Sequence, residues 1–398
     1  MAHLQLADGV LNYQIDGPEN APVLVLSNSL GTDLGMWDTQ IPLWSQYFRV
    51  LRYDTRGHGA SLVTEGPYTI EQLGGDVLAL LDGLDIQKAH FVGLSMGGLI
   101  GQWLGINAGD RLHSLTLCNT AAKIASDEVW NPRIDTVLKG GQQAMVDLRN
   151  GSLARWFTPG FVQAQPEQAQ RICQMLAHTS PQGYAANCAA VRDADYREQL
   201  GRIQVPALIV AGTEDVVTTP EHGRFMQAGI KGAEYVDFPA AHLSNVEIGE
   251  AFSAVCSTSC WLTEDHAMDE KQRYDAGMQV RRAVLGDAHV DRSLEKLNDF
   301  NGEFQEMITR HAWGDIWTRP GLPRHTRSLI TIAMLIGMNR NDELKLHLRA
   351  AANNGVTREE IKEVLMQSAI YCGIPAANAT FHLAESVWDE LGVESRQQ

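Results

Sequence analysis

Short apolar runs alternate with stretches of helical periodicity along the first two thirds of the chain. Six runs rich in β-branched and aromatic residues predict strands: Val23–Ser27, Phe48–Tyr53, His90–Val92, Leu112–Cys118, Ala207–Ala211 and Glu234–Phe238. Strands that alternate with helices are typical of a parallel, doubly wound α/β sheet. Between about residues 120 and 203 only helical segments follow, including residues 166–179 and 183–192. We expect this insertion to lie over the sheet as a helical lid.

The pattern changes again near residue 262, after which the apolar segments have helical spacing. Residues 263–270 are polar and mostly acidic, which favours a linker. Further along, Thr357 and Glu360 have the spacing of a capping box, in which each side chain accepts a hydrogen bond from an orphan amide at a helix start. The sequence therefore predicts an α/β domain at residues 1–262, a linker, and a small all-α domain at residues 271–398.

Composition and charge narrow the class of protein. Apolar residues make up 44% of the 398 residues and charged residues 20%, as in a soluble globular protein. The net charge of −16 disfavours a nucleic-acid surface. The longest apolar stretch, residues 329–338, is too short to span a bilayer, and the N-terminus lacks the pattern of a secretory signal. We therefore expect a cytoplasmic protein with no membrane or nucleic-acid partner.

The six cysteines offer neither a metal site nor a disulfide framework. They include no C-x-x-C pair, and the closest two, Cys256 and Cys260, have no histidine cluster beside them. Structural metals and disulfide scaffolds need grouped ligands or regularly spaced cysteines. The sequence therefore predicts free thiols, no metal and no cofactor.

The segment Gly93-Leu94-Ser95-Met96-Gly97 has the G-x-S-x-G spacing of a nucleophile elbow. It follows a predicted strand and precedes a helical stretch, so Ser95 would stand on a sharp turn between the two. Small flanking residues are needed there because the strand and the helix pass close to each other. A single G-x-S-x-G also occurs by chance in many proteins, so the prediction of Ser95 as a nucleophile depends on the rest of the chain.

Later segments supply candidates for the acid, the base and the oxyanion hole. Asp215 and its neighbour Glu214 follow one predicted strand, and His242 lies in the loop after the next. We favour Asp215 over Glu214, because the acid must reach the ring nitrogen of the histidine that faces away from the serine. The turn after the first predicted strand would place the amide of Leu30 beside that of Met96, where both could bind an oxyanion.

The chain order serine, aspartate, histidine resembles that of the α/β-hydrolase family over about two thirds of the sequence. The segment Asn28-Ser29-Leu30-Gly31-Thr32-Asp33-Leu34, followed by Met36-Trp37-Asp38, more specifically resembles 3-oxoadipate enol-lactone hydrolases. This resemblance implies a serine hydrolase whose substrate carries a free carboxylate. Trp130 and Arg133, one helical turn apart in the lid, are the candidates to bind that carboxylate; a solvated surface arginine is the alternative interpretation.

The helical domain has its own group of candidate polar residues, which are Arg324, Arg327, Arg340, Glu343 and His347. The last three are spaced to line one face of a helix predicted over residues 341–353. Cations beside a titratable histidine can bind and protonate a small anion. A glutamate and a histidine at this spacing are also common on exposed helix surfaces, so the residues alone leave both interpretations open.

Residues from about 270 to 390 resemble 4-carboxymuconolactone decarboxylases of the alkylhydroperoxidase-D-like helical superfamily. The matching segments are Trp313–Trp317, Arg327–Leu329, Glu343–His347 and Tyr371–Ala377. The peroxidase branch needs a C-x-x-C ahead of its histidine, and Arg340 and Glu343 stand at those places here, which excludes thiol peroxidase chemistry. The resemblance implies that His347 protonates carbon as a general acid. It leaves the three arginines as candidates to orient the substrate carboxylates, and Glu303 as another candidate member of the site.

Together the two resemblances imply consecutive steps of the β-ketoadipate pathway. The helical domain would convert 4-carboxymuconolactone to 3-oxoadipate enol-lactone, and the α/β domain would hydrolyse that lactone to 3-oxoadipate by a Ser-His-Asp mechanism. The expected partners are small lactone carboxylates and, through the helical domain, further copies of this chain. The alternative is a serine esterase or carbon–carbon bond hydrolase whose helical domain only assembles oligomers.

Overall fold

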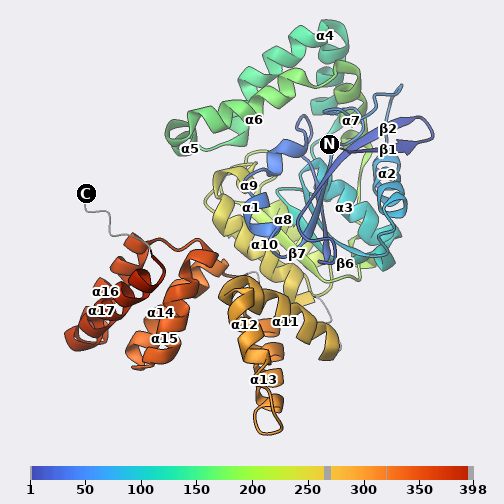
Figure 1. Ribbon diagram of the computed structural model, residues 1–398. Helices are drawn as coiled ribbons and strands as arrows, with labels where there is room; N and C mark the ends of the chain where they lie inside the picture. Colours follow the sequence, from blue (N-terminus) through green and yellow to red (C-terminus); the bar gives the residue numbers. More distant parts are fainter. Residues whose placement is uncertain (1, 264–269, 320, 393–398) are drawn as a thin grey trace. The chain divides into compact units, whose positions relative to one another are not determined.

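The computed structural model describes residues 2–263, 270–319 and 321–392. The chain divides into two compact units, Met1–Glu264 and Asp265–Gln398 (Figure 1). The linker expected at residues 263–270 lies almost entirely outside the described residues. Each unit buries its own hydrophobic core.

The first unit is built on one eight-stranded sheet with the strand order β1-β2-β4-β3-β5-β6-β7-β8. The strands are β1 (Ala2–Leu6), β2 (Gly9–Asp16), β3 (Val23–Ser27), β4 (Arg49–Tyr53), β5 (Ala89–Leu94), β6 (Leu112–Cys118), β7 (Ala207–Gly212) and β8 (Glu234–Phe238). From β4 to β8 all neighbours are parallel, as predicted. The apolar pattern misses β1 and β2, an antiparallel hairpin at the sheet edge. Their residues are largely exposed or half-buried, so they lack the continuous apolar runs of the inner strands.

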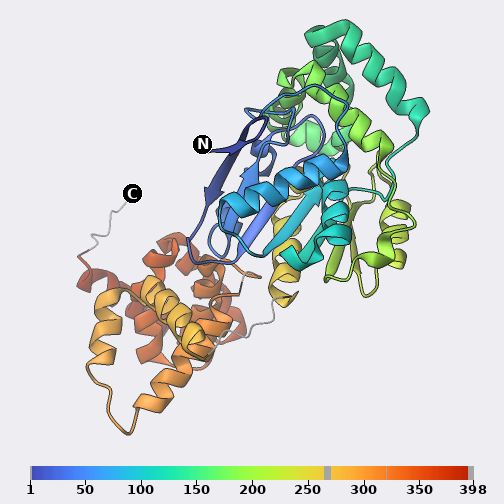
Figure 2. The ribbon, with the colours of Figure 1, turned by 90° about the vertical axis from the view of Figure 1, so that its right-hand side faces the viewer.

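Helices cover both faces of this sheet. Outside the lid they are α1 (Ile41–Trp44), α2 (Ile70–Gly83), α3 (Met96–Asn107), α8 (Pro220–Gly229), α9 (Ser244–Glu247) and α10 (Gly249–Thr263). Helices α2 and α3 lie on one face, and α10 packs on the other (Figure 2). Because both faces are covered, every residue of β5 and β7 is buried.

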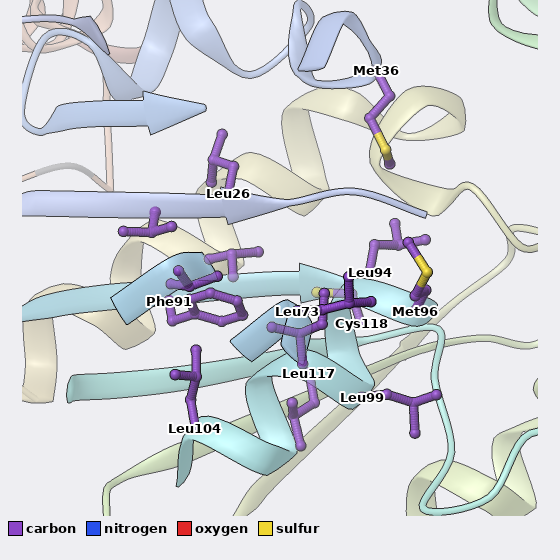
Figure 3. Close-up of a cluster of buried hydrophobic side chains, with 14 of the residues drawn as sticks. Leu26, Met36, Leu73, Phe91, Leu94, Met96, Leu99, Leu104, Leu117 and Cys118 are labelled. Atoms are coloured by element: carbon purple, nitrogen blue, oxygen red, sulfur yellow. The ribbon is translucent and has the colours of Figure 1, made fainter. Parts of the chain in front are cut away.

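The core beneath α3 holds the ends of the inner strands in place. Figure 3 shows Leu26 of β3, Phe91 of β5, Leu117 of β6 and Leu104 of α3 in one cluster. Each of these side chains is at most 1% exposed. Burying one such side chain stabilises a fold by about 1.5–3 kcal/mol. The packed sheet therefore gives a rigid base to the loops that follow β3, β5, β6 and β7.

Four helices between β6 and β7 form the predicted lid. They are α4 (Asp127–Trp156), α5 (Pro159–Ala164), α6 (Pro166–His178) and α7 (Pro181–Asp193). Gly141 interrupts α4 with φ 57° and ψ −139°, a conformation that side chains with a Cβ rarely adopt. Helix α4 therefore consists of two legs that meet at a kink, and both α6 and α7 pack against it.

The second unit is helical throughout its described residues. Its elements are α11 (Glu270–Leu285), α12 (Asp287–Leu294), α13 (Gly302–Ile308), a π-helix η4 (Thr309–Ile316), α14 (Arg324–Gly337), α15 (Asn341–Ala350), η5 (Ala351–Asn354), α16 (Arg358–Tyr371) and α17 (Ile374–Glu390). The capping box predicted at the start of α16 is confirmed, because Thr357 and Glu360 exchange hydrogen bonds with each other's backbone amides. None of the described helices combines the length and apolarity needed to cross a bilayer.

Candidate active sites

Ser95 stands on the turn between β5 and α3, with φ 57° and ψ −113°. Such a conformation is rare for a residue with a side chain and is common at functional sites. The flanking glycines are required sterically: a Cβ on Gly93 would lie 2.1 Å from the carbonyl oxygen of Gly97, and a Cβ on Gly97 would lie 2.2 Å from that of Ser27. The G-x-S-x-G spacing thus follows from the close approach of α3 to β3 and β5.

The structure brings His242, in the loop after β8, next to Asp215, in the loop after β7. Asp215 Oδ2 lies 2.8 Å from His242 Nδ1 and accepts from Thr218 Oγ1 at 2.8 Å, while Oδ1 accepts from the amides of Val217 and Thr218. Burial raises the pKa of Asp215, but the charge and hydrogen bond of His242 and the other donors bring it down to about 2. The ionised carboxylate therefore accepts the Nδ1 proton, which leaves Nε2 as the basic nitrogen. Glu214 is exposed.

Two backbone amides remain open beside Ser95. The amides next to them are occupied, since Gly31 N donates to His58 Nε2 at 2.8 Å and Gly97 N donates to the carbonyl oxygen of Asn28 at 3.1 Å. Within the described residues, neither Leu30 N nor Met96 N has an acceptor. Burial lowers the pKa of the His58 ring to about 4, so it stays neutral and accepts the bond that holds the Leu30 turn.

A pocket opens in front of Ser95 and is walled by the lid. Its lining includes Ser95 and His242 from the sheet side and Trp130, Arg133 and Arg155 from the two legs of α4. The guanidinium carbon of Arg133 lies 5.1 Å from the centre of the Trp130 ring, as a cation–π pair. The predicted lid residues thus face the same space as the predicted nucleophile and base. Arg155 is an additional cation that the sequence pattern does not reveal.

His347 is one of the half-buried polar candidates in the helical unit. It lies on α15, with its ring stacked 6.4 Å from that of Trp317 at an angle of 19°. Burial, followed by the nearby His289, lowers the pKa of the His347 ring. Within the described residues its buried Nδ1 has no hydrogen-bond partner. The ring is therefore held in place by packing, with a nitrogen that remains available to another molecule.

Comparison with known proteins gives one family match within each of the two units. Residues 22–247 match the family described as alpha/beta hydrolase fold, and residues 302–386 match the carboxymuconolactone decarboxylase family. The chain is 47% identical over 247 residues to 3-oxoadipate enol-lactonase 1 of Acinetobacter baylyi. This alignment covers 62% of this chain and 91% of the enol-lactonase. It is also 57% identical over 126 residues to 4-carboxymuconolactone decarboxylase of the same organism. That alignment covers 32% of this chain and 94% of the decarboxylase.

The crystal structure of the enol-lactonase from Burkholderia xenovorans LB400 superposes on the first unit. The TM-score is 0.64 at 47% identity, and the match covers 66% of this chain and all of that one. This chain joins an α/β-hydrolase to a member of the carboxymuconolactone decarboxylase family. The predicted fold class is thereby confirmed for both parts.

In the α/β-hydrolase unit, the sequence does not reveal that Asn119 also donates a hydrogen bond to the catalytic candidate Asp215. Asn119 directly follows β6, with φ 42°. Its Nδ2 donates to Asp215 Oδ2 and to the carbonyl oxygen of Ala241, both at 3.1 Å, and its Oδ1 accepts from Ser244 Oγ at 2.5 Å. The only signal in the sequence is a polar residue at the carboxyl end of an inner strand.

In the decarboxylase-family unit, the candidate polar residues differ in how far they are exposed. Helix α15 begins at Asn341, so Arg340 is its N-cap residue rather than a member of its face. Arg340 and Glu343 are both exposed, as is Glu303 on α13. The remaining candidates, Arg324 and Arg327, lie half-buried in the first turn of α14. Within the described residues, His289 is the nearby titratable group that affects the His347 ring, and the roles of Arg340 and Glu343 stay predictions.

Among the described residues, no group of three or more His, Cys, Asp and Glu side chains is placed to hold a metal ion. The free thiols among the described side chains are those of Cys118, Cys173, Cys188, Cys256 and Cys372.

Proposed function

We propose that this chain is a bifunctional enzyme that catalyses two consecutive steps of the β-ketoadipate pathway. The helical unit decarboxylates 4-carboxymuconolactone to 3-oxoadipate enol-lactone, and the α/β-hydrolase unit hydrolyses the enol-lactone to 3-oxoadipate. One observation carries this proposal: two segments that do not overlap align with 91% and 94% of two separate enzymes that bear those names.

In the hydrolase unit, His242 Nε2 takes the proton of Ser95, and Ser95 Oγ attacks the lactone carbonyl. The negative charge that develops on the carbonyl oxygen is bound by the open amides of Leu30 and Met96. When the tetrahedral intermediate collapses, the C–O bond of the ring breaks and the released enol becomes a ketone. Water activated by His242 then cleaves the acyl-enzyme.

In the helical unit, loss of CO₂ leaves an electron pair that the conjugated lactone accepts as a dienolate. His347 then delivers a proton to the carbon next to the lactone carbonyl, which gives the enol-lactone. Arg324 and Arg327, in the first turn of α14, remain the better-placed of the predicted arginines to orient the two carboxylates, because Arg340 is exposed.

The helical unit also serves as the contact between copies of this chain. Its surface exposes large apolar side chains on α14, α16 and α17, among them Met334, Met366, Ile370, Tyr371 and Ile374. Ile370 and Tyr371 are 79% and 81% exposed. Apolar residues of α14 and α16, among them Ile330 and Tyr371, also line one shared pocket, and contiguous apolar surface marks interaction sites. Light scattering on the wild type and on an Ile370→Lys, Ile374→Lys variant tests this: we expect the variant to have the lower mass, and equal masses would refute the contact.

Purified protein supplied with 4-carboxymuconolactone tests the proposed function. Released CO₂ and the final product are followed by NMR, and we expect stoichiometric CO₂ and 3-oxoadipate. If the protein hydrolyses phenyl acetate well but neither releases CO₂ above the spontaneous rate nor prefers the enol-lactone, it is a general serine esterase with an assembly module.

A further inference from the structure

The pocket between Ser95 and the lid contains two arginines, and none of its described lining residues carries a negative charge. Arg133 and Arg155 both line the pocket in front of Ser95, and its described lining includes no aspartate or glutamate. Arg133 lies over the ring of Trp130. Within the described residues, neither guanidinium forms an ion pair with a carboxylate of this chain.

Arg155 is held in the pocket by neutral acceptors of its own helix. Its Nε donates to the carbonyl oxygen of Gly151 at 3.2 Å, and its second terminal nitrogen donates to Ser152 Oγ at 3.3 Å. These bonds fix the direction of the side chain without neutralising its charge. A guanidinium has five N–H groups, so donors remain for a ligand.

The two cations also repel each other. Burial, followed by the charge of Arg133, lowers the pKa of Arg155. Two like charges in a partly buried pocket are unfavourable, and a bound anion removes that cost. Titratable groups perturbed in this way gather at functional sites. The arrangement is therefore suited to a ligand with a negative charge at the lid end and a reactive carbonyl at the Ser95 end.

We propose that Arg155 and Arg133 together form a carboxylate subsite, and that Arg155 makes the pocket select lactones with an anionic side chain over neutral esters. This inference rests on the proposed enol-lactone hydrolysis and assigns the recognition of its free carboxylate. Ring opening adds a second carboxylate next to Ser95, so a short dicarboxylate such as adipate resembles the product and should occupy the same pocket.

Substrate preference in Arg155 variants tests the selectivity. Arg155→Met is expected to lower kcat/KM for the enol-lactone by about 10- to 100-fold, the worth of a charge-assisted hydrogen bond. The loss of kcat/KM for the neutral ester phenyl acetate should be at least about tenfold smaller than the loss for the enol-lactone, and Arg155→Lys should recover part of the loss for the enol-lactone. Arg149→Met is the matched control, since Arg149 lies on the same leg of α4 but donates to Gln174 at 2.8 Å, outside this lining. An equal loss on both substrates, or no loss on the lactone, would overturn the proposal.

Adipate binding separates the subsite from the reaction. Calorimetry on the Ser95→Ala variant should show that adipate binds and that adding Arg155→Met weakens binding by the same 10- to 100-fold order. If wild type fails to hydrolyse the enol-lactone yet adipate binding depends on Arg155, the proposed function fails and the subsite stands. If adipate binds equally with and without Arg155, the subsite is refuted whatever the activity.

Discussion

The two candidate sites differ in how far the chain's own hydrogen bonds define them. In the α/β-hydrolase unit, Asp215 orients His242 and is itself held by donors from Thr218 and Asn119. In the helical unit, His347 is fixed by packing on Trp317, and its Nδ1 has no partner within the described residues. The first site is organised before substrate arrives, whereas we expect the second to gain its polar contacts from the substrate. The two units should therefore respond differently to substitutions.

Removal of the nucleophile is expected to have the largest effect. Ser95→Ala should reduce enol-lactone hydrolysis by on the order of 10⁵- to 10⁶-fold, as loss of a serine nucleophile does in other hydrolases. Decarboxylation should be unchanged, because His347 lies in the other unit. The readout is the accumulation of enol-lactone from 4-carboxymuconolactone; continued formation of 3-oxoadipate would contradict the role of Ser95.

Changing the acid should be almost as damaging. Asp215→Asn should lower kcat for hydrolysis by about 10⁴-fold, because an amide in that place no longer selects the Nδ1–H tautomer of His242. Glu214→Gln is the control, since Glu214 is exposed, and it should keep wild-type kcat. Activity lost equally in both variants would mean that the acid has been misassigned.

The carboxylate of Asp215 should also make the free energy of unfolding depend on pH. The folded pKa of Asp215, about 2, lies below its ordinary 3.8, so its ionised form stabilises the fold above pH 4 and this contribution is lost as the pH falls towards 2. The difference in unfolding free energy between wild type and Asp215→Asn should shrink by about 2 kcal/mol over that range. Urea titrations at several pH values measure it, and a constant difference would argue against the depressed pKa.

His347 tests the less organised site. His347→Gln should lower decarboxylation by about 10²- to 10⁴-fold, the usual contribution of a general acid, and leave hydrolysis of the enol-lactone intact. His382, 74% exposed on α17, supplies the matched control as His382→Gln. Release of CO₂ at the wild-type rate by His347→Gln would leave the helical unit as an assembly module.

The smallest expected effect concerns the start of α16. Thr357→Ala should destabilise the helical unit by about 1 kcal/mol through loss of the capping box. The bonds from the Thr357 amide and hydroxyl, together with His325, hold the pKa of Glu360 at about 2. The ionised Glu360 therefore stabilises the helix start at pH values above the ordinary pKa of glutamate, and this stabilisation disappears as the pH falls towards 2. Thermal unfolding at neutral pH measures the change, with Thr357→Ser as the control that should retain stability.

Sequence reasoning succeeds where local backbone geometry limits the choice of residue. The nucleophile elbow can be predicted from the sequence because the backbone around positions 93 and 97 leaves no room for a Cβ, so only Gly93 and Gly97 fit there. The sequence does not reveal Arg155, because the non-helical backbone at Gly141 breaks the helical periodicity between Arg155 and the predicted pair Trp130 and Arg133. The role of Arg340 stays a prediction: it is the exposed N-cap residue of α15, and its spacing from His347 does not by itself show whether its side chain reaches the site.

Complementation between two inactive variants tests the central claim most directly. Ser95→Ala and His347→Gln are each given 4-carboxymuconolactone, alone and as an equimolar mixture, and 3-oxoadipate is measured. The account predicts that the first variant stops at the enol-lactone, the second releases no CO₂ above the spontaneous rate, and the mixture forms 3-oxoadipate. A mixture that remains inactive, or a single substitution that abolishes both steps, would contradict two independent active sites in one chain.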